Sequence, residues 1–186
     1  KLLGPEGAVT TNDISALLTD MALKFKYAAA ATTAVSLAAT LANGANTYEG
    51  LTNCTHTQLD NSSDKYPHAK LVLTITDTFA AAPTAGSMID VYMTVEDIDS
   101  TADETPIPGA SDIIYLAKHI GSFVLDNQDV ATRKVLFLLD VLAGVEKAKF
   151  NFVNGSGQTI SYASTATTLK VHPFTFEDDA QKIPID

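Results

Sequence analysis

Two stretches, KLVLTITDT at residues 70–78 and MIDVYMTV at residues 88–95, decide the fold class of this chain. In the first, Leu71, Leu73 and Ile75 alternate with side chains on the other face, and the second stretch repeats this period of two. Successive side chains of a β-strand point to opposite faces of a sheet, so the period indicates strands with one buried face. We therefore predict a half-buried β-strand over each stretch.

Six further stretches are also predicted to form β-strands, and residues typical of turns separate them. Predicted strands cover residues 113–116, 121–125, 134–139, 148–153, 159–163 and 168–176. The segment AAAPTAGS at residues 80–87 is a connector of the kind that joins antiparallel neighbours. NGSG at residues 154–157 predicts a hairpin turn, because Asn and Gly tolerate the positive φ of tight loops. Many short strands with regular turns favour an all-β fold, an antiparallel β-sandwich or barrel, over residues 28–186.

The N-terminal residues 1–27 differ from the rest of the chain, because their apolar side chains follow a helical period. Asn12 or Asp13 can cap a helix at its start. The apolar stripe consists of Ile14, Leu17, Leu18, Met21 and Phe25. We predict a short amphipathic helix or arm whose stripe packs on the body of the domain or on a neighbouring subunit. These five residues are the candidate interface residues.

The composition excludes several classes of function. The chain has 186 residues, of which 18% are charged, and a formal net charge of −10. So acidic a chain repels phosphate backbones and anionic lipids, so we expect it to bind neither nucleic acid nor a membrane. Its single cysteine, Cys54, cannot form an intramolecular disulfide or a two-cysteine metal site. The charged fraction is below the roughly 25% of an average domain. We therefore expect a surface with many uncharged polar side chains, which is suited to packing against other proteins.

The strongest candidate for a metal site is the acidic loop EDIDSTADE at residues 96–104. Asp97, Asp99, Thr101 and Asp103 match the alternating oxygen ligands that open a calcium loop. The pattern also requires a glycine at the turn and a bidentate glutamate at the end, and the sequence has neither at those positions. The sequence predicts a solvated loop and no cofactor, and it leaves open whether this loop binds a cation.

Potential catalytic side chains do not form a motif. The four histidines, His56, His68, His119 and His172, are scattered, and no G-x-S-x-G elbow lies near them. Cys54 and His56 would share a face of an extended chain, but an inert thiol is the simpler interpretation. We therefore predict no catalytic residues and a protein that is not an enzyme.

Several short segments occur in an informative order along the chain. They are LANGA (41–45), TYEG (47–50), LDNSS (59–63), PTAGS (83–87) followed by IDVYMTVED (89–97), and KFNFVNGSG (149–157). This order resembles a group of tailed-bacteriophage virion proteins over about residues 40–178. The segments are turns and strand patterns and not chemical signatures, and residues 1–26 do not align with the group.

The resemblance implies a small jelly-roll-like β-sandwich on the outside of a phage capsid, a decoration or cement protein. The expected partners are the major capsid protein and further copies of the chain, as a dimer or trimer. The expected location is the virion capsid surface, after synthesis in the host cytoplasm. Two alternatives stay open: an adhesin or carbohydrate-binding module of a tail or fibre, and a hydrolase on a jelly-roll scaffold. No constellation of residues in the sequence supports the hydrolase.

Overall fold

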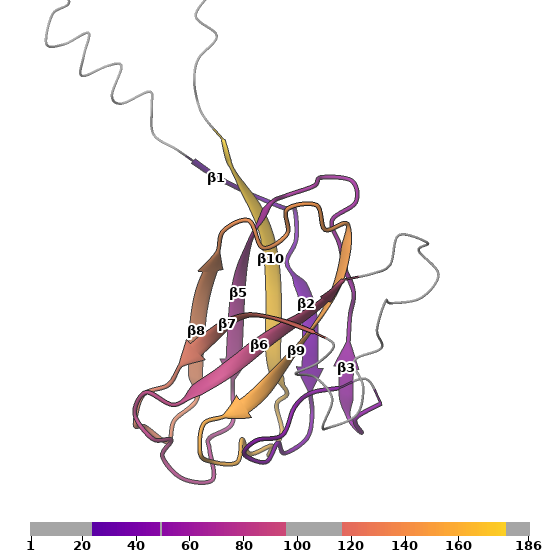
Figure 1. The fold of residues 1–186 in the computed structure, drawn as a ribbon. Coiled ribbons are helices and arrows are strands. Elements are labelled where there is room, and N and C mark those ends of the chain that lie inside the picture. Colours follow the sequence, from indigo (N-terminus) through magenta and orange to yellow (C-terminus); the bar gives the residue numbers. More distant parts are fainter. Residues whose placement is uncertain (1–23, 49, 96–116, 178–186) are drawn as a thin grey trace, which may run out of the picture. The chain divides into compact units, whose positions relative to one another are not determined.

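Strands with alternating side chains make up the computed structural model, which describes residues 24–48, 50–95 and 117–177 (Figure 1). These residues contain no α-helix. The strands are β1 (Lys24–Tyr27), β2 (Thr32–Leu37), β3 (Cys54–His56), β4 (Leu59–Asp60), β5 (His68–Ile75), β6 (Met88–Val95), β7 (Lys118–Val124), β8 (Thr132–Leu138), β9 (Lys147–Gly155) and β10 (Thr167–Glu177).

The strands form two antiparallel sheets. The six-stranded sheet has the order β3-β2-β10-β5-β8, with β1 paired to β10, and the four-stranded sheet has the order β4-β9-β6-β7. Within the larger compact unit, Tyr27–Phe174, the two sheets pack face to face as a β-sandwich (Figure 1). The prediction of an all-β antiparallel sandwich is thereby confirmed.

The described part of a second unit consists of residues 24–26 and 175–177. Here Lys26 Nζ lies 2.6 Å from Glu177 Oε1, and the rings of Phe25 and Phe176 are 5.1 Å apart. The sequence predicts a helix at Phe25, but this residue lies in strand β1, whose backbone pairs with β10. The other four residues of the predicted stripe, the acidic loop 96–104 and the predicted strand 113–116 lie outside the described residues.

The core lies between the two sheets and is built by the inward-facing side chains of each strand. In β5 and β6 these are the residues of the alternating pattern, and they are at most 2% exposed except for Val95 at the end of β6, which is half-buried. The core members on the four longest strands are Ala69, Leu71, Leu73, Ile75, Ile89, Val91, Met93, Ala148, Phe150, Phe152, Leu169 and Val171. Because these positions alternate, the intervening residues of the same strands form the outward faces of the sandwich.

Two connections differ from those predicted. Residues 80–87 do not join antiparallel neighbours, because β5 belongs to the six-stranded sheet and β6 to the four-stranded sheet. Residues 159–163 do not form a strand, and Ile160 instead makes isolated bridges to Leu41 and Phe79. The predicted hairpin at residues 154–157 is therefore absent, since β9 has no partner strand after the turn.

The NGSG segment closes a loop through the side chain of Asn154. Its Nδ2 donates to the carbonyl oxygens of Leu41, Ala42 and Gln158 at 2.8–3.2 Å, and its Oδ1 accepts from the Ser156 N–H at 3.1 Å. Gly155 is required next to it, because a Cβ there would lie 2.7 Å from a backbone oxygen. The segment thus ties the end of β9 to residues 41–42, which precede it by more than 100 positions.

Candidate functional site

Three cationic side chains lie on the outward face of the six-stranded sheet. Lys70 is on β5, Arg133 on β8 and Lys170 on β10, at positions that alternate with more deeply buried neighbours. In the register of these adjacent strands, Arg133 lies opposite Thr74 and Lys170 lies opposite Val72. The three cations therefore occupy neighbouring positions on one surface, which we call the cationic face.

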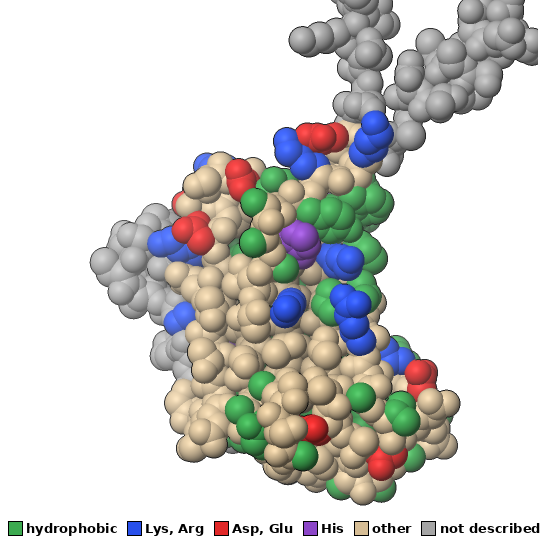
Figure 2. Space-filling view, turned by 180° about the vertical axis from the view of Figure 1, so that it is seen from behind, with side chains coloured by type: hydrophobic (Ala, Val, Ile, Leu, Met, Phe, Trp, Pro, Cys, Tyr) green, Lys and Arg blue, Asp and Glu red, His purple; other side chains and the backbone are tan. Residues whose placement is uncertain are grey.

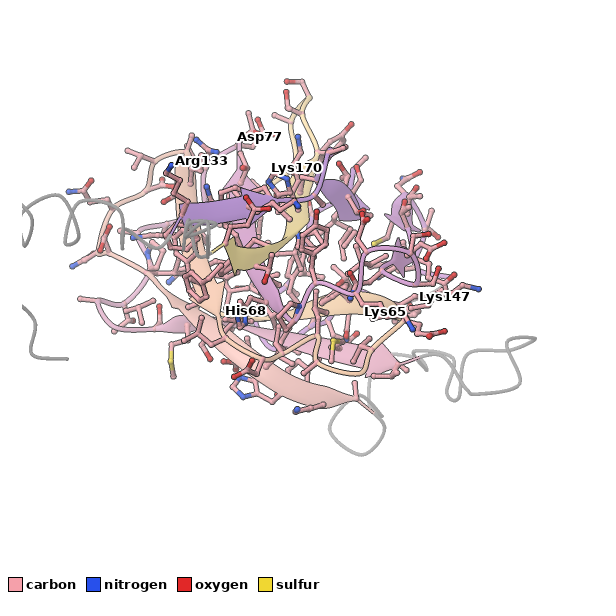
Figure 3. All side chains as sticks on the ribbon, turned by 90° about the horizontal axis from the view of Figure 1, so that it is seen from above. Lys65, His68, Asp77, Arg133, Lys147 and Lys170 are labelled. Carbon is pink, nitrogen blue, oxygen red and sulfur yellow. The ribbon has the colours of Figure 1, made fainter. Side chains whose placement is uncertain are left out.

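A groove of about 420 Å³ is lined by the cationic face together with Val72, Thr74 and His172. Figure 2 shows blue Lys and Arg side chains gathered around a histidine on this side of the molecule, beside a green apolar area. In the end-on view of Figure 3, the labelled Arg133 and Lys170 lie on the same side of the sandwich. The groove is thus open, cationic and partly apolar.

The cationic face has no anionic partner among the described residues. Lys26, Lys65 and Lys134 form ion pairs with a glutamate or aspartate at 2.6–3.4 Å, whereas no ion pair is formed by the three cations of the face. Asp77 follows β5, but its carboxylate accepts the backbone N–H of Ala163 at 2.7 Å and further N–H groups of the same loop. The face therefore carries positive charge in a chain whose net charge is −10.

An aromatic cluster borders the groove and fixes one of its cations. Phe174 is fully buried, with the rings of Tyr27, His68 and Phe137 at 5.2–6.0 Å from its own. The Lys70 Nζ lies 5.6 Å from the Tyr27 ring centroid and 5.5 Å from that of Phe137. Such cation–π contacts hold an ammonium in place without neutralising its charge.

His172 is held against the same cluster. Its Nε2 lies 2.8 Å from the carbonyl oxygen of Ala28, and because a carbonyl only accepts, this nitrogen carries the proton. Its ring lies 4.7 Å from that of Tyr27. These two contacts hold the His172 ring in place, and it lines the groove.

Apolar side chains continue the surface along β8, at the edge of the six-stranded sheet. Val135 is 46% exposed, Phe137 is 48% exposed and Leu139, one residue past the strand, is 62% exposed. We call these three residues the apolar strip. Contiguous exposed apolar surface on a sheet edge is typical of sites where another chain binds.

A second cluster lies on the outward face of the four-stranded sheet and joins Asp90, His119 and Ser122. The Ser122 hydroxyl donates to Asp90 Oδ1 at 2.6 Å, and His119 Nε2 lies 3.1 Å from Ser122 Oγ and 3.6 Å from Asp90 Oδ1. In a catalytic triad, the histidine stands between the other two and uses a different nitrogen for each. Here one nitrogen faces both groups and the hydroxyl proton goes to the carboxylate, so the geometry of a triad is absent from this cluster.

Tyr92 stacks beside this cluster, with its ring 5.2 Å from that of His119. Partial burial, followed by the nearby charge of Asp90, raises the pKa of the Tyr92 hydroxyl above its ordinary value of 10.0. A raised pKa keeps the phenol protonated at neutral pH, so Tyr92 is a neutral neighbour of the cluster.

The predicted proximity of Cys54 and His56 is observed, with Sγ 3.9 Å from Nδ1. Burial raises the pKa of the Cys54 thiol to about 11. The reactive species of cysteine is the thiolate, so this thiol is almost entirely protonated at neutral pH. The raised pKa, and not the distance to His56, favours the interpretation of Cys54 as an inert thiol.

His68 also has a structural role, because its Nδ1 accepts the backbone N–H of Asp140 at 2.9 Å. Within residues 24–48, 50–95 and 117–177, no three His, Cys, Asp or Glu side chains are grouped so that they could hold a metal ion. The same residues include no helix that could cross a membrane.

Two of the short segments singled out in the sequence, LDNSS (59–63) and PTAGS (83–87), have structural roles. In LDNSS, the buried Asn61 donates to the carbonyl oxygens of Tyr66 and Val145 and accepts the Tyr66 N–H, all at 2.9–3.0 Å. In PTAGS, the Ser87 N–H donates to the Thr84 carbonyl at 3.0 Å, and Gly86 has a φ of +81°. These segments shape loops, and none of their described side chains reaches the groove.

The groove was not among the sites predicted from the sequence, although part of its signal is present there. The alternation in residues 70–74 assigns Lys70, Val72 and Thr74 to one face, and residues 133–137 place Arg133, Val135 and Phe137 together in the same way. What the sequence does not indicate is that these two strands are neighbours. That pairing is a property of the fold.

Comparison with known proteins gives no further constraint on function. No protein-family model matches the chain, and no curated protein is significantly similar to it. The interpretation of the site therefore depends on its own geometry and charge.

Proposed function

We propose that the chain is a non-enzymatic structural protein of a bacteriophage virion that binds the outside of the capsid shell and stabilises it. The fold is a β-sandwich, and the order of the segments from residue 41 to residue 157 resembles virion proteins. Two of these segments, around Asn61 and Gly86, form loops with specific hydrogen bonds or backbone conformations. This supports the interpretation that the shared segments reflect a shared fold.

The observation that carries the proposal is the apolar strip beside the cationic face. Val135, Phe137 and Leu139 leave 46–62% of their surface in water at the edge of a sheet. Burial of apolar surface is favourable by about 25 cal/mol per Å², so exposed side chains of this kind contribute when a partner covers them. The six-stranded sheet therefore supplies a surface suited to docking on another protein.

Stabilisation of a shell follows from mass action. A protein that binds the assembled shell and not its separated subunits shifts the equilibrium toward assembly. No chemical step is required, and the Asp90, Ser122 and His119 cluster does not have the geometry of a triad. The proposed partners are the major capsid protein and further copies of this chain, and the proposed place is the outer capsid surface.

The alternative of a carbohydrate-binding adhesin depends on exposed aromatic rings that can stack on sugars. Among the described residues, the exposed aromatic side chains are Phe25 on β1, Phe137 on β8 and Tyr162 before β10, at 51%, 48% and 39% exposure, so they are spread over three separate elements. Tyr66 is buried, and Tyr92 packs on His119. The described residues thus favour protein docking over sugar binding.

The test is co-sedimentation of the purified chain with assembled capsid shells of its phage, combined with shell melting. We expect the chain to pellet with shells and to raise their melting temperature. The double variant Val135→Ser/Leu139→Ser should lose both effects, because it removes two members of the apolar strip.

The matched control is Val124→Ser/Val130→Ser, which also replaces two exposed aliphatic residues, at 56% and 50% exposure, but outside the strip. It should pellet with shells as the unmodified chain does. Failure of the unmodified chain to bind any shell would contradict the proposal, and glycan binding would then support the adhesin.

A further inference from the structure

The charge of the six-stranded sheet is opposite to that of the chain as a whole. Lys70, Arg133 and Lys170 are three of only 12 Lys and Arg residues, against 22 acidic ones, and they share one groove. None of the three forms an ion pair with another described residue, whereas several other lysines do. A groove whose cations lack an anion within the described part of the chain is complementary to an anionic ligand.

The positions of the cations suit an extended segment. They lie on three adjacent strands, with Lys70 opposite His172, Val72 opposite Lys170 and Thr74 opposite Arg133. Neighbouring strands are about 4.8 Å apart, and side chains on one face of a strand repeat at about 7 Å. Lys70, Lys170 and Arg133 therefore occupy three successive levels along the strand direction, about 7 Å apart. Carboxylates on one face of an extended peptide repeat at the same interval of about 7 Å.

The surface also discriminates among anions. Val72 lies within the groove, and the apolar strip of Val135, Phe137 and Leu139 continues it along β8. Nucleic acids and sulfated polysaccharides present charge without comparable apolar side chains, so they would leave the apolar strip uncovered. A peptide that mixes acidic and apolar residues matches both parts of the surface.

We propose that the cationic face and the apolar strip bind an extended segment of a partner protein that carries both acidic and apolar side chains. Acidic side chains would pair with Lys70, Arg133 and Lys170, while apolar ones cover Val135 and Phe137. The inference rests on the proposed function only for the identity of the partner as a capsid protein. The binding chemistry itself can be tested without shells.

The experiment measures fluorescence anisotropy of a labelled peptide titrated with the purified full chain. The peptide carries Glu and then Val at every second position, with Ser between them, so that in an extended conformation the acidic and apolar side chains share one face. Two comparison peptides carry Gln or Lys in place of Glu. We expect the Glu peptide to bind at least about 10-fold more tightly than the Gln peptide, with an affinity that falls as salt is raised. The Lys peptide should not bind.

Charge-reversal variants locate the site. Lys70→Glu/Arg133→Glu/Lys170→Glu should weaken binding of the Glu peptide by at least about 30-fold. The control Lys65→Glu/Lys118→Glu/Lys147→Glu changes net charge equally at exposed or half-exposed positions outside the groove, and should change affinity by less than about threefold. If the first variant does not fold, as judged by circular dichroism, the neutral variant Lys70→Gln/Arg133→Gln/Lys170→Gln replaces it.

Three results would overturn the inference. These are equal binding of the Glu and Gln peptides, equal loss in both charge-reversal variants, and preferential binding of heparin or single-stranded DNA over the Glu peptide. Shell co-sedimentation separates the two proposals. Peptide binding without shell binding would contradict the capsid function alone, whereas shell binding without peptide binding would contradict only the acidic segment.

Discussion

The outward face of the four-stranded sheet buries polar side chains, whereas the outward face of the six-stranded sheet leaves apolar side chains exposed. On the first, Thr94 is 6% exposed and Asn151 is 0% exposed. On the second, Val135 is 46% exposed and Phe137 is 48% exposed. Residue type alone would predict the reverse at all four positions.

Both arrangements reduce the stability of the isolated chain. Neither Nδ2 nor Oδ1 of Asn151 has a hydrogen-bond partner among the described residues, and a buried polar group in that state costs about 1–3 kcal/mol. The exposed Val135 and Phe137 forgo the gain of about 25 cal/mol per Å² that burial would bring. The comparison teaches that the six-stranded sheet is the side on which a partner would add stability.

The largest expected effect comes from a negative charge placed on each face. Asn151→Asp should lower the free energy of unfolding by about 3–5 kcal/mol at pH 7, because it buries an uncompensated charge. Val135→Asp should cost less than about 1 kcal/mol, because its side chain can remain in water. Urea unfolding of both variants measures the difference.

The control for that prediction is to repeat the unfolding of both variants at a series of lower pH values. Burial raises the pKa of a carboxyl, so the cost of Asn151→Asp should shrink as the pH falls and the new carboxyl becomes protonated. The cost of Val135→Asp should change little over the same range. Equal losses of unfolding free energy in the two variants at pH 7 would contradict the inferred difference in burial between the two faces.

How much of this architecture is predictable depends on whether a feature is local. The alternation of Leu71, Leu73 and Ile75 predicts β5 and its buried face, and residues 88–95 coincide with β6. The pairing of strands is not local. Residues 80–87 have the composition of a hairpin connector, yet they cross between sheets, because β5 pairs with β8 and β10 while β6 pairs with β7 and β9.

The candidate site was missed for the same reason. Lys70, Arg133 and Lys170 are separated by up to 100 positions in the sequence, and only the order β10-β5-β8 brings them together. In the same way, only the fold shows that β2 is a central strand, which pairs with β10 on one side and with β3 on the other. A short-range pattern cannot distinguish a central strand from an edge strand.

A second prediction separates buried polar groups that have partners from those that do not. Asn151→Leu should raise the free energy of unfolding by about 1 kcal/mol, because it removes an amide without hydrogen bonds. Asn154→Leu, three residues along β9, should lower it by about 2–3 kcal/mol, because it leaves buried carbonyls of Leu41, Ala42 and Gln158 unsatisfied. Urea unfolding at neutral pH compares the pair, and a loss of equal size in both would mean that the Asn151 amide is hydrogen-bonded in solution.

The smallest expected effect concerns one aspartate near each sheet, of which Asp60 is exposed and Asp77 is half-exposed. Asp77, after β5, has its pKa lowered below the ordinary 3.8 chiefly by the N–H groups of Ala163 and Ser164. Asp60, at the end of β4, has its pKa lowered below 3.8 chiefly by the hydroxyl and N–H of Ser62. A lowered pKa contributes stability above pH 3.8, and that contribution is lost as the pH falls through the folded-state value.

The two aspartates differ in the distance along the chain that their bonds span. Asp77 bonds a loop 86–88 positions away, which exists only in the folded state, whereas Asp60 bonds a residue two positions away, which an unfolded chain can also reach. Asp77→Asn should therefore lower the melting temperature at pH 6 more than Asp60→Asn does. The difference should disappear as the pH falls well below 3.8, when the native carboxyls are protonated too. Thermal melts of both variants between pH 6 and pH 2.5 measure it, and a deficit of Asp77→Asn that persists at the acid end would assign the effect to lost packing and not to the ionised carboxylate.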